Sequence, residues 1–136
     1  MIKLIVGNKG SGKTKTLITM VNEAINTSKG NVVCVEKGNT LTYDVNHKAR
    51  LIDIDTYSIT GFDAFYGFFC GLFAGNYDIT EVFVDASLRI GGRDFLAFAI
   101  MIEKLVKLLD ENGATMTFTV SCDKNDLPER IHKYII

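Results

Sequence analysis

The feature that most constrains this chain is residues 7–14, which read Gly-Asn-Lys-Gly-Ser-Gly-Lys-Thr and fit the pattern G-x-x-x-x-G-K-[ST]. The segment directly follows residues 2–6, an apolar run rich in β-branched residues that predicts a strand. A helical repeat of apolar residues follows it, from Leu17 to Ser28. A strand, a tight glycine-rich turn and a helix must therefore succeed one another at the start of the fold.

The residue types fixed by this pattern are those that a polyphosphate cradle requires. Glycines allow backbone N–H groups to approach an anion closely and to adopt unusual φ and ψ angles. Lys13 supplies a positive charge for the β- and γ-phosphates, and the Thr14 hydroxyl supplies a ligand for Mg²⁺. The helix that begins here directs its N-terminal dipole at the same anion. The residues expected to bind ATP or ADP are Gly7, Asn8, Lys9, Gly10, Ser11, Gly12, Lys13, Thr14 and Lys15.

Length, charge and cysteine content limit the other possibilities. The 136 residues fit one domain, 1–136, and contain no linker or repeat. A net charge of −1 argues against a basic surface for nucleic acid. Cys34, Cys70 and Cys122 are too far apart for a zinc site or an obvious disulfide framework. Because the start, Met1-Ile2-Lys3, runs directly into the first strand, we expect no room for a signal peptide and a cytoplasmic protein.

Strand and helix patterns alternate along the rest of the chain. Strands are predicted at residues 31–36, 81–85, 115–120 and 131–136, and helices at residues 62–75 and 93–111. Residues 49–54 fit either a hairpin or an edge strand. This alternation predicts an α/β fold, a three-layer sandwich in which helices cover both faces of a mostly parallel sheet.

The segment at residues 62–75 combines aromatic residues with glycines at four-residue intervals, Gly67, Gly71 and Gly75. It fits a core helix packed on the sheet, or a surface for self-association or for a protein partner. The apolar stretch between Asp63 and Asp78 is about fourteen residues long. A bilayer span needs about 20 apolar residues, so we expect no membrane span here.

A second candidate element of the site is Asp85, which ends the apolar strand predicted at residues 81–85. Mg²⁺ held by Thr14 needs a carboxylate nearby, commonly at the end of a neighbouring strand. Ligands of open α/β sheets gather at the carboxyl ends of the strands, so Asp85 and Gly7 should lie at the same end. We therefore predict that Thr14 and Asp85 hold the metal.

Together these residues resemble the P-loop NTPase superfamily, with residues 7–14 as its Walker A motif and residues 82–85 as its Walker B motif. The order of strands resembles the RecA-like, additional-strand division. The resemblance implies that Ser121 senses the γ-phosphate. It also implies a water-activating glutamate, but Ala86 stands directly after Asp85. Some relatives carry this glutamate at the end of the second strand, a location that Glu36 matches, so Lys13 and Glu36 are the expected catalytic residues.

Three functions fit these residues. The first is an ATP-binding domain, a Mg²⁺-dependent and slow ATPase whose nucleotide state controls association with itself or with another protein. The second is a small phosphotransferase, with Arg89 and Arg93 lining an acceptor pocket. The third is a nucleotide-sensing module without catalysis, which Ala86 favours. Adenine is expected because the chain has no Asn-Lys-x-Asp motif for guanine. Whether hydrolysis occurs, the partner and the oligomeric state are left open.

Overall fold

The computed structural model describes all residues from Met1 to Ile136 and contains one sheet of five parallel strands. Across the sheet the strands follow the order β1-β5-β4-β2-β3. Their bounds are Ile2–Gly7 for β1, Asn31–Glu36 for β2, Arg50–Asp53 for β3, Ile79–Asp85 for β4 and Thr115–Ser121 for β5. Because all five strands are parallel, their carboxyl ends meet at one end of the sheet.

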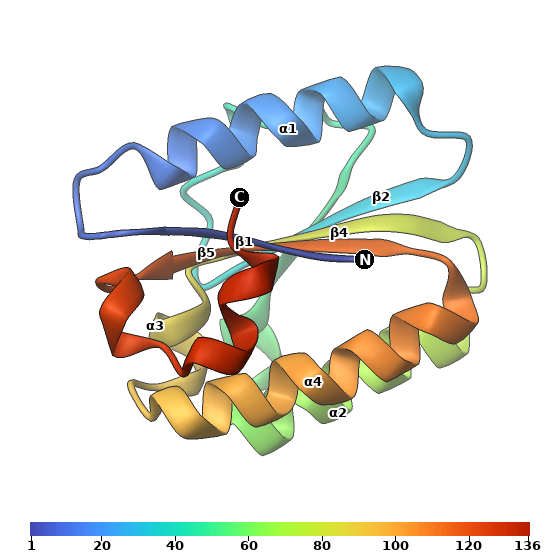
Figure 1. The fold of residues 1–136 in the computed structure, drawn as a ribbon. Coiled ribbons are helices and arrows are strands. Elements are labelled where there is room, and N and C mark those ends of the chain that lie inside the picture. Colours follow the sequence, from blue (N-terminus) through green and yellow to red (C-terminus); the bar gives the residue numbers. More distant parts are fainter.

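Helices cover both faces of this sheet, which gives three layers (Figure 1). The helix α1 (Lys13–Thr27) lies on one face, and α2 (Phe62–Gly75), α3 (Ser87–Gly91) and α4 (Phe95–Asn112) lie on the other. The strands contribute to a core on each side: Val82 and Val84 of β4 belong to one, and Phe83 to the other. Burial on both faces explains the unbroken apolar stretches of the central strands, residues 32–35 in β2 and 82–84 in β4. The arrangement agrees with the predicted α/β class.

Most predicted elements lie within a few residues of their expected bounds. Residues 49–54 contain β3, which is an edge strand parallel to β2 and therefore not part of a hairpin. The helix α4 begins after Asp94, whose side chain accepts a hydrogen bond from Ala97 N at 2.9 Å. It ends at Asn112, and the next residue, Gly113, has a φ of 72° in the left-handed region. The helix α3 has five residues, too few for a helical period to be visible in the sequence.

The predicted strand at residues 131–136 is wrong. Glu129–Tyr134 form a 3₁₀ helix, which begins after Pro128. Only Ile135 pairs with the sheet, through an isolated bridge to Leu4 of β1. Ile131 is fully buried in the core, and Tyr134 and Ile135 pack against it. Apolar residues spaced three and four apart fit a helical turn, so the β-branched residues alone were a misleading signal.

The helix α2 turns one face to the core and the other to solvent. Its buried residues are Phe62, Phe65, Phe69 and Phe73. Phe69 packs against Phe118 of β5 with ring centroids 5.9 Å apart, which confirms the predicted core helix. The three glycines, Gly67, Gly71 and Gly75, lie on the exposed side, where a Cβ would meet no atom within 4 Å. Their role in association stays a prediction. None of the helices combines the length and the apolar content needed to cross a membrane.

One buried hydroxyl of the sheet has no hydrogen-bond partner, that of Thr117 on β5. A buried polar group without a partner costs about 1–3 kcal/mol. Replacement by the isosteric valine removes that cost, so Thr117→Val is expected to raise the free energy of unfolding by about 1 kcal/mol. Urea denaturation of the two proteins tests this. The reverse result, a less stable variant, would mean that the hydroxyl has a partner.

Candidate functional site

The loop between β1 and α1 has the backbone geometry that its glycines predict. Gly10 and Gly12 both have a φ of +87°, which other residues rarely adopt. A Cβ at Gly7 would lie 2.5 Å from Ser11 Oγ, so a larger residue here would force the Ser11 side chain to move. The amide of Ser11 donates to the carbonyl of Asn8 at 3.1 Å, which closes the turn. The loop is thus compact, and it ends at the N-terminus of a fifteen-residue helix.

Lys13, the first residue of α1, lies against this loop. Its ammonium donates to Asn8 O at 3.0 Å and, at 3.4 Å, to Ser11 Oγ. The residue is only 8% exposed, although no carboxylate pairs with it. A cation this shielded from water gains most from a bound anion, because screening by solvent is reduced there.

Thr14 and Asp85 meet as the sequence predicts. The Thr14 hydroxyl lies 3.2 Å from each carboxylate oxygen of Asp85. A second hydroxyl, that of the fully buried Thr119 on β5, also donates to Asp85. Thr119 was missed by sequence reasoning; the available signal was the threonine at every second position of β5. No group of three His, Cys, Asp or Glu side chains is placed to hold a metal. A divalent ion here would therefore depend on Thr14, Asp85, phosphate oxygens and water, which suits Mg²⁺.

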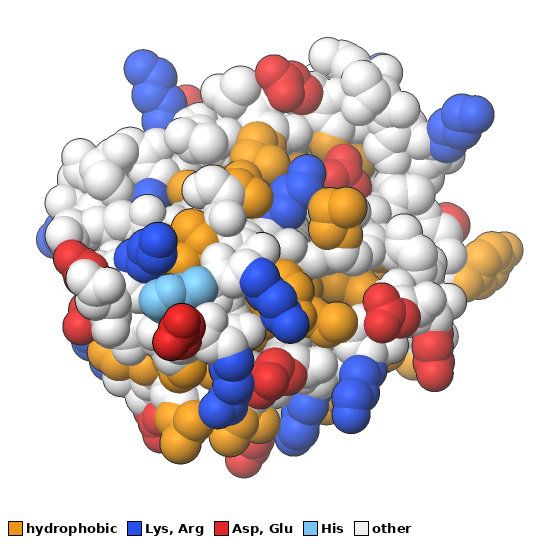
Figure 2. All heavy atoms as spheres, viewed as in Figure 1, with side chains coloured by type: hydrophobic (Ala, Val, Ile, Leu, Met, Phe, Trp, Pro, Cys, Tyr) orange, Lys and Arg blue, Asp and Glu red, His pale blue; other side chains and the backbone are white.

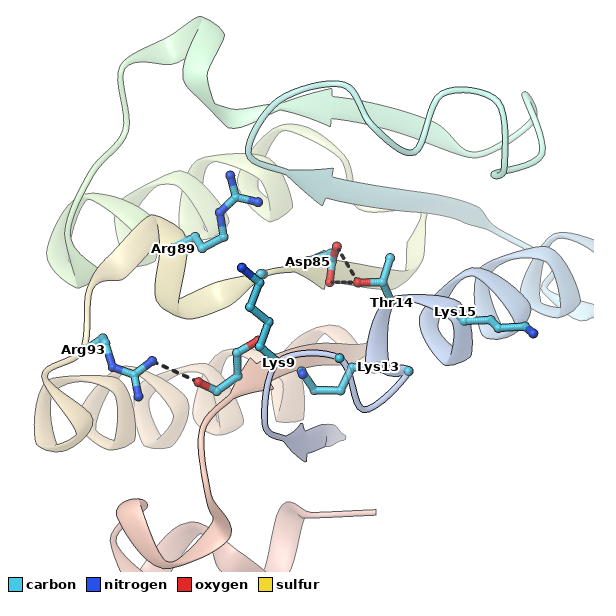
Figure 3. A pocket seen from close by; sticks show the side chains of 11 residues that line it. Lys9, Lys13, Thr14, Lys15, Asp85, Arg89 and Arg93 are labelled. Atoms are coloured by element: carbon cyan, nitrogen blue, oxygen red, sulfur yellow. Dashed lines mark hydrogen bonds between the residues drawn. The ribbon is translucent and has the colours of Figure 1, made fainter.

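The loop and these strand ends line a cavity of about 670 Å³ (Figure 3). Its lining residues are Lys9, Gly10, Gly12, Lys13, Thr14, Lys15, Asp85, Ala86, Arg89, Arg93 and Ser121. Five of them are cationic and one is a carboxylate. The cavity is therefore a strongly positive site in a chain whose net charge is −1.

Two of the cations, Arg89 and Arg93, come from α3 and the turn that follows it, opposite the loop (Figure 3). Arg93 Nη1 donates to the carbonyl of Ser121 at 3.0 Å, and its guanidinium lies over the ring of Phe95, 5.3 Å from the centroid. From the sequence, the two arginines fit the lining of an acceptor pocket, stabilisers of phosphate charge in a neighbouring subunit, or plain surface charges. The structure places both at the cavity of their own chain.

The structure does not bring Glu36 into the cavity. Its Cα pairs with that of Asp85 in the sheet, but Glu36 is only 2% exposed. One carboxylate oxygen accepts from Thr40 N at 3.0 Å and Thr40 Oγ1 at 2.8 Å, and the other accepts from Leu41 N at 3.0 Å. The side chain therefore anchors the loop after β2. Its interpretation as a water-activating base finds no support in this geometry.

The carboxylates of Glu36 and Asp85 also affect Cys34, which lies two residues before Glu36 in β2. Burial, then the charge of Glu36, then that of Asp85 raise the pKa of the Cys34 thiol to about 12. Burial likewise raises the pKa of Cys122, with Asp126 adding to the effect. Both thiols are thus protonated at neutral pH, and both residues are buried in the core.

The candidate nucleotide site therefore contains most, but not all, of the predicted residues. Lys9, Lys13, Lys15 and Ser121 line the cavity together with Thr14 and Asp85. Gly7, Asn8 and Ser11 shape the loop without lining the cavity, and Glu36 lies outside it. Comparisons of the chain with models of known protein families and with curated proteins found no match.

Proposed function

We propose that this domain binds a nucleoside triphosphate, ATP in the first instance, together with Mg²⁺. The observation that carries the proposal is the convergence of the loop amides, Lys13 and the Thr14–Asp85 pair on one positively charged cavity. Each supplies one requirement of a metal–nucleotide complex: donors and charge for the phosphates, and oxygen ligands for the metal.

The strand order supports assignment to the P-loop NTPases. The strand β5 lies between β1, which leads into the loop, and β4, which ends in Asp85. An extra strand at this position is what the additional-strand, RecA-like division implies. Gly7 pairs with Ser121 in the register of β1 and β5. This register supports the proposal that Ser121 senses the γ-phosphate.

Hydrolysis by this site should be slow. Lys13, the loop amides and Mg²⁺ would offset charge on the γ-phosphoryl group. Asp85 is the one carboxylate of the cavity, and it faces the Thr14 hydroxyl. No further carboxylate is placed to orient a water molecule, since Glu36 anchors a loop. We therefore infer that ATP stays bound long enough for the nucleotide state to serve as a signal. The predicted surface for association is α2.

The test of metal binding is Asp85→Asn. The variant is expected to bind Mg²⁺–ATP about 10- to 100-fold more weakly than the natural protein in calorimetric titrations. With EDTA present, the variant should bind ATP at least as tightly as the natural protein, because a carboxylate that no metal neutralises repels the phosphates. Asp110→Asn, at an exposed position of α4, is the matched control. Unchanged Mg²⁺–ATP affinity in Asp85→Asn would refute the metal assignment.

Phosphoryl transfer to a small acceptor is a second candidate, favoured by the two arginines on the wall opposite the loop. Incubation with ATP and a panel of nucleosides and small hydroxyl compounds distinguishes phosphoryl transfer from ATP hydrolysis. A phosphorylated acceptor would support transfer, and slow formation of ADP alone would support the ATPase.

A further inference from the structure

Most polar side chains of this protein lie at its surface, and charges of both signs are interspersed over the face seen in Figure 2. Five polar or charged residues are buried, namely Lys13, Glu36, Ser87, Thr117 and Thr119. A buried polar group costs free energy unless it is hydrogen-bonded, so each of the five needs an explanation. Lys13 lies against the loop between β1 and α1, and Glu36 anchors the segment after β2. The hydroxyls of Ser87 and of the two threonines remain to be explained.

The two threonines of β5 form a natural comparison. Thr117 and Thr119 lie two residues apart on the strand, and each is at most 1% exposed. Because side chains alternate along a strand, both project from the same face of the sheet. The Thr117 hydroxyl has no hydrogen-bond partner, whereas the Thr119 hydroxyl donates to Asp85 Oδ1. The two positions therefore share their surroundings in the strand and differ in their contact with Asp85.

The Asp85 carboxylate needs a contact that fixes its orientation. Asp85 is only half-buried, and the torsion that rotates an aspartate carboxylate has broad energy minima. The Thr14 hydroxyl lies 3.2 Å from both carboxylate oxygens, so it does not favour one oxygen over the other. The Thr119 hydroxyl contacts Oδ1 alone. This hydrogen bond is therefore the contact that makes the two oxygens of Asp85 inequivalent.

Thr119 is itself held firmly in the fold. In the sheet it is paired with Ile5 of β1. Its carbonyl accepts a hydrogen bond from the Ser87 hydroxyl at 2.8 Å, and both residues are fully buried. This bond ties the start of α3 to β5 and satisfies the Ser87 hydroxyl. The χ1 torsion of a threonine is also restricted, because its Cβ is branched. The donor to Asp85 is therefore fixed before any ligand binds.

We infer that Thr119 is a positioning residue of the proposed metal site, which holds the Asp85 carboxylate in the orientation in which it meets the Thr14 hydroxyl. The inference rests on the proposed function, because it assumes that Thr14 and Asp85 hold Mg²⁺. Thr119 does not line the cavity, so it acts through Asp85 and not on the nucleotide. Removal of a group that orients a metal ligand typically lowers metal affinity about 10- to 100-fold.

The experiment measures the ratio of the affinity for Mg²⁺–ATP to the affinity for ATP in EDTA, both by calorimetric titration. Thr119→Val replaces the hydroxyl by a methyl group, and the ratio should fall about tenfold through the loss of Mg²⁺–ATP affinity alone. Thr119→Ser restores the hydroxyl and should keep the ratio within about threefold of the natural value. Thr117→Val makes the same exchange on the same face of β5 and, as the matched control, should leave the ratio unchanged.

A double-mutant cycle tests whether Thr119 acts through Asp85. In Asp85→Ala there is no carboxylate to position, so adding Thr119→Val should not lower the ratio further. A further fall in that background overturns the inference. So does an unchanged ratio in Thr119→Val alone, or an equal loss of ATP affinity with and without the metal, which a merely structural role would cause.

Two further measurements complete the experiment. If Mg²⁺ does not strengthen ATP binding by the natural protein, the proposed metal site itself fails, and this outcome is recognised without any variant. Thermal denaturation verifies that the variants are folded. Thr119→Ala also lacks the hydroxyl, and it should repeat the result of Thr119→Val; a natural ratio in this variant would contradict the inference.

Discussion

Lys13→Ala is expected to lower the affinity for Mg²⁺–ATP at least about 100-fold, which in most titrations means no detectable binding. The ammonium is directed at the loop between β1 and α1, 3.0 Å from Asn8 O, and it is shielded from solvent. A charge-assisted hydrogen bond to phosphate is worth about twice a neutral one, and reduced screening adds to it. Calorimetric titration of both proteins measures the loss.

The stability of the same variant provides an internal check. Lys13 has no carboxylate partner, so its removal leaves no buried charge behind. We expect the free energy of unfolding without nucleotide to change by less than about 1 kcal/mol. Lys29→Ala, in the exposed turn after α1, is the matched control and should bind nucleotide normally. Wild-type ATP affinity in Lys13→Ala would refute the nucleotide site as a whole.

Glu36→Gln is expected to lower the free energy of unfolding by about 2–3 kcal/mol. The carboxylate accepts three hydrogen bonds, from the backbone of Thr40 and Leu41 and from the Thr40 hydroxyl. A glutamine amide would direct its NH₂ group at one of these donors, and the buried amide of Leu41 or the donors of Thr40 would lose a partner. Urea denaturation measures the effect. Glu23→Gln, on the exposed side of α1, should leave stability unchanged.

The same variant decides between the two roles of Glu36. If it anchors the loop, ATP turnover per folded molecule should stay within about threefold of the natural rate. If it is a general base, the variant should fold with normal stability and lose turnover by about 100-fold or more. The second result would overturn the geometry described above, in which both carboxylate oxygens already accept hydrogen bonds.

The local chemistry of the site could be predicted from the sequence because it is encoded in consecutive residues. The turn from β1 into α1 requires glycine at Gly10 and Gly12, since both have positive φ. The proximity of Asp85 to Thr14 also follows from pattern, because parallel strands bring their carboxyl ends together. Runs of strand-forming residues identified β2, β4 and β5, although only β2 and β4 contain unbroken apolar stretches, at residues 32–35 and 82–84.

The contacts between segments far apart in the chain could not be predicted from the sequence and became known only from the tertiary structure. The pairing that puts β5 between β1 and β4 brings Thr119 to Asp85, and the path of α3 brings Arg89 and Arg93 to the loop. The conformation of a short segment also depends on what it packs against. Glu129–Tyr134 form a 3₁₀ helix, where the sequence predicted a strand at residues 131–136. Local propensity is worth a few tenths of a kcal/mol per residue, and packing outweighs it. The sequence alone therefore determined which residues form the loop proposed to hold a phosphate, and the packing of the chain decided which side chains face that loop.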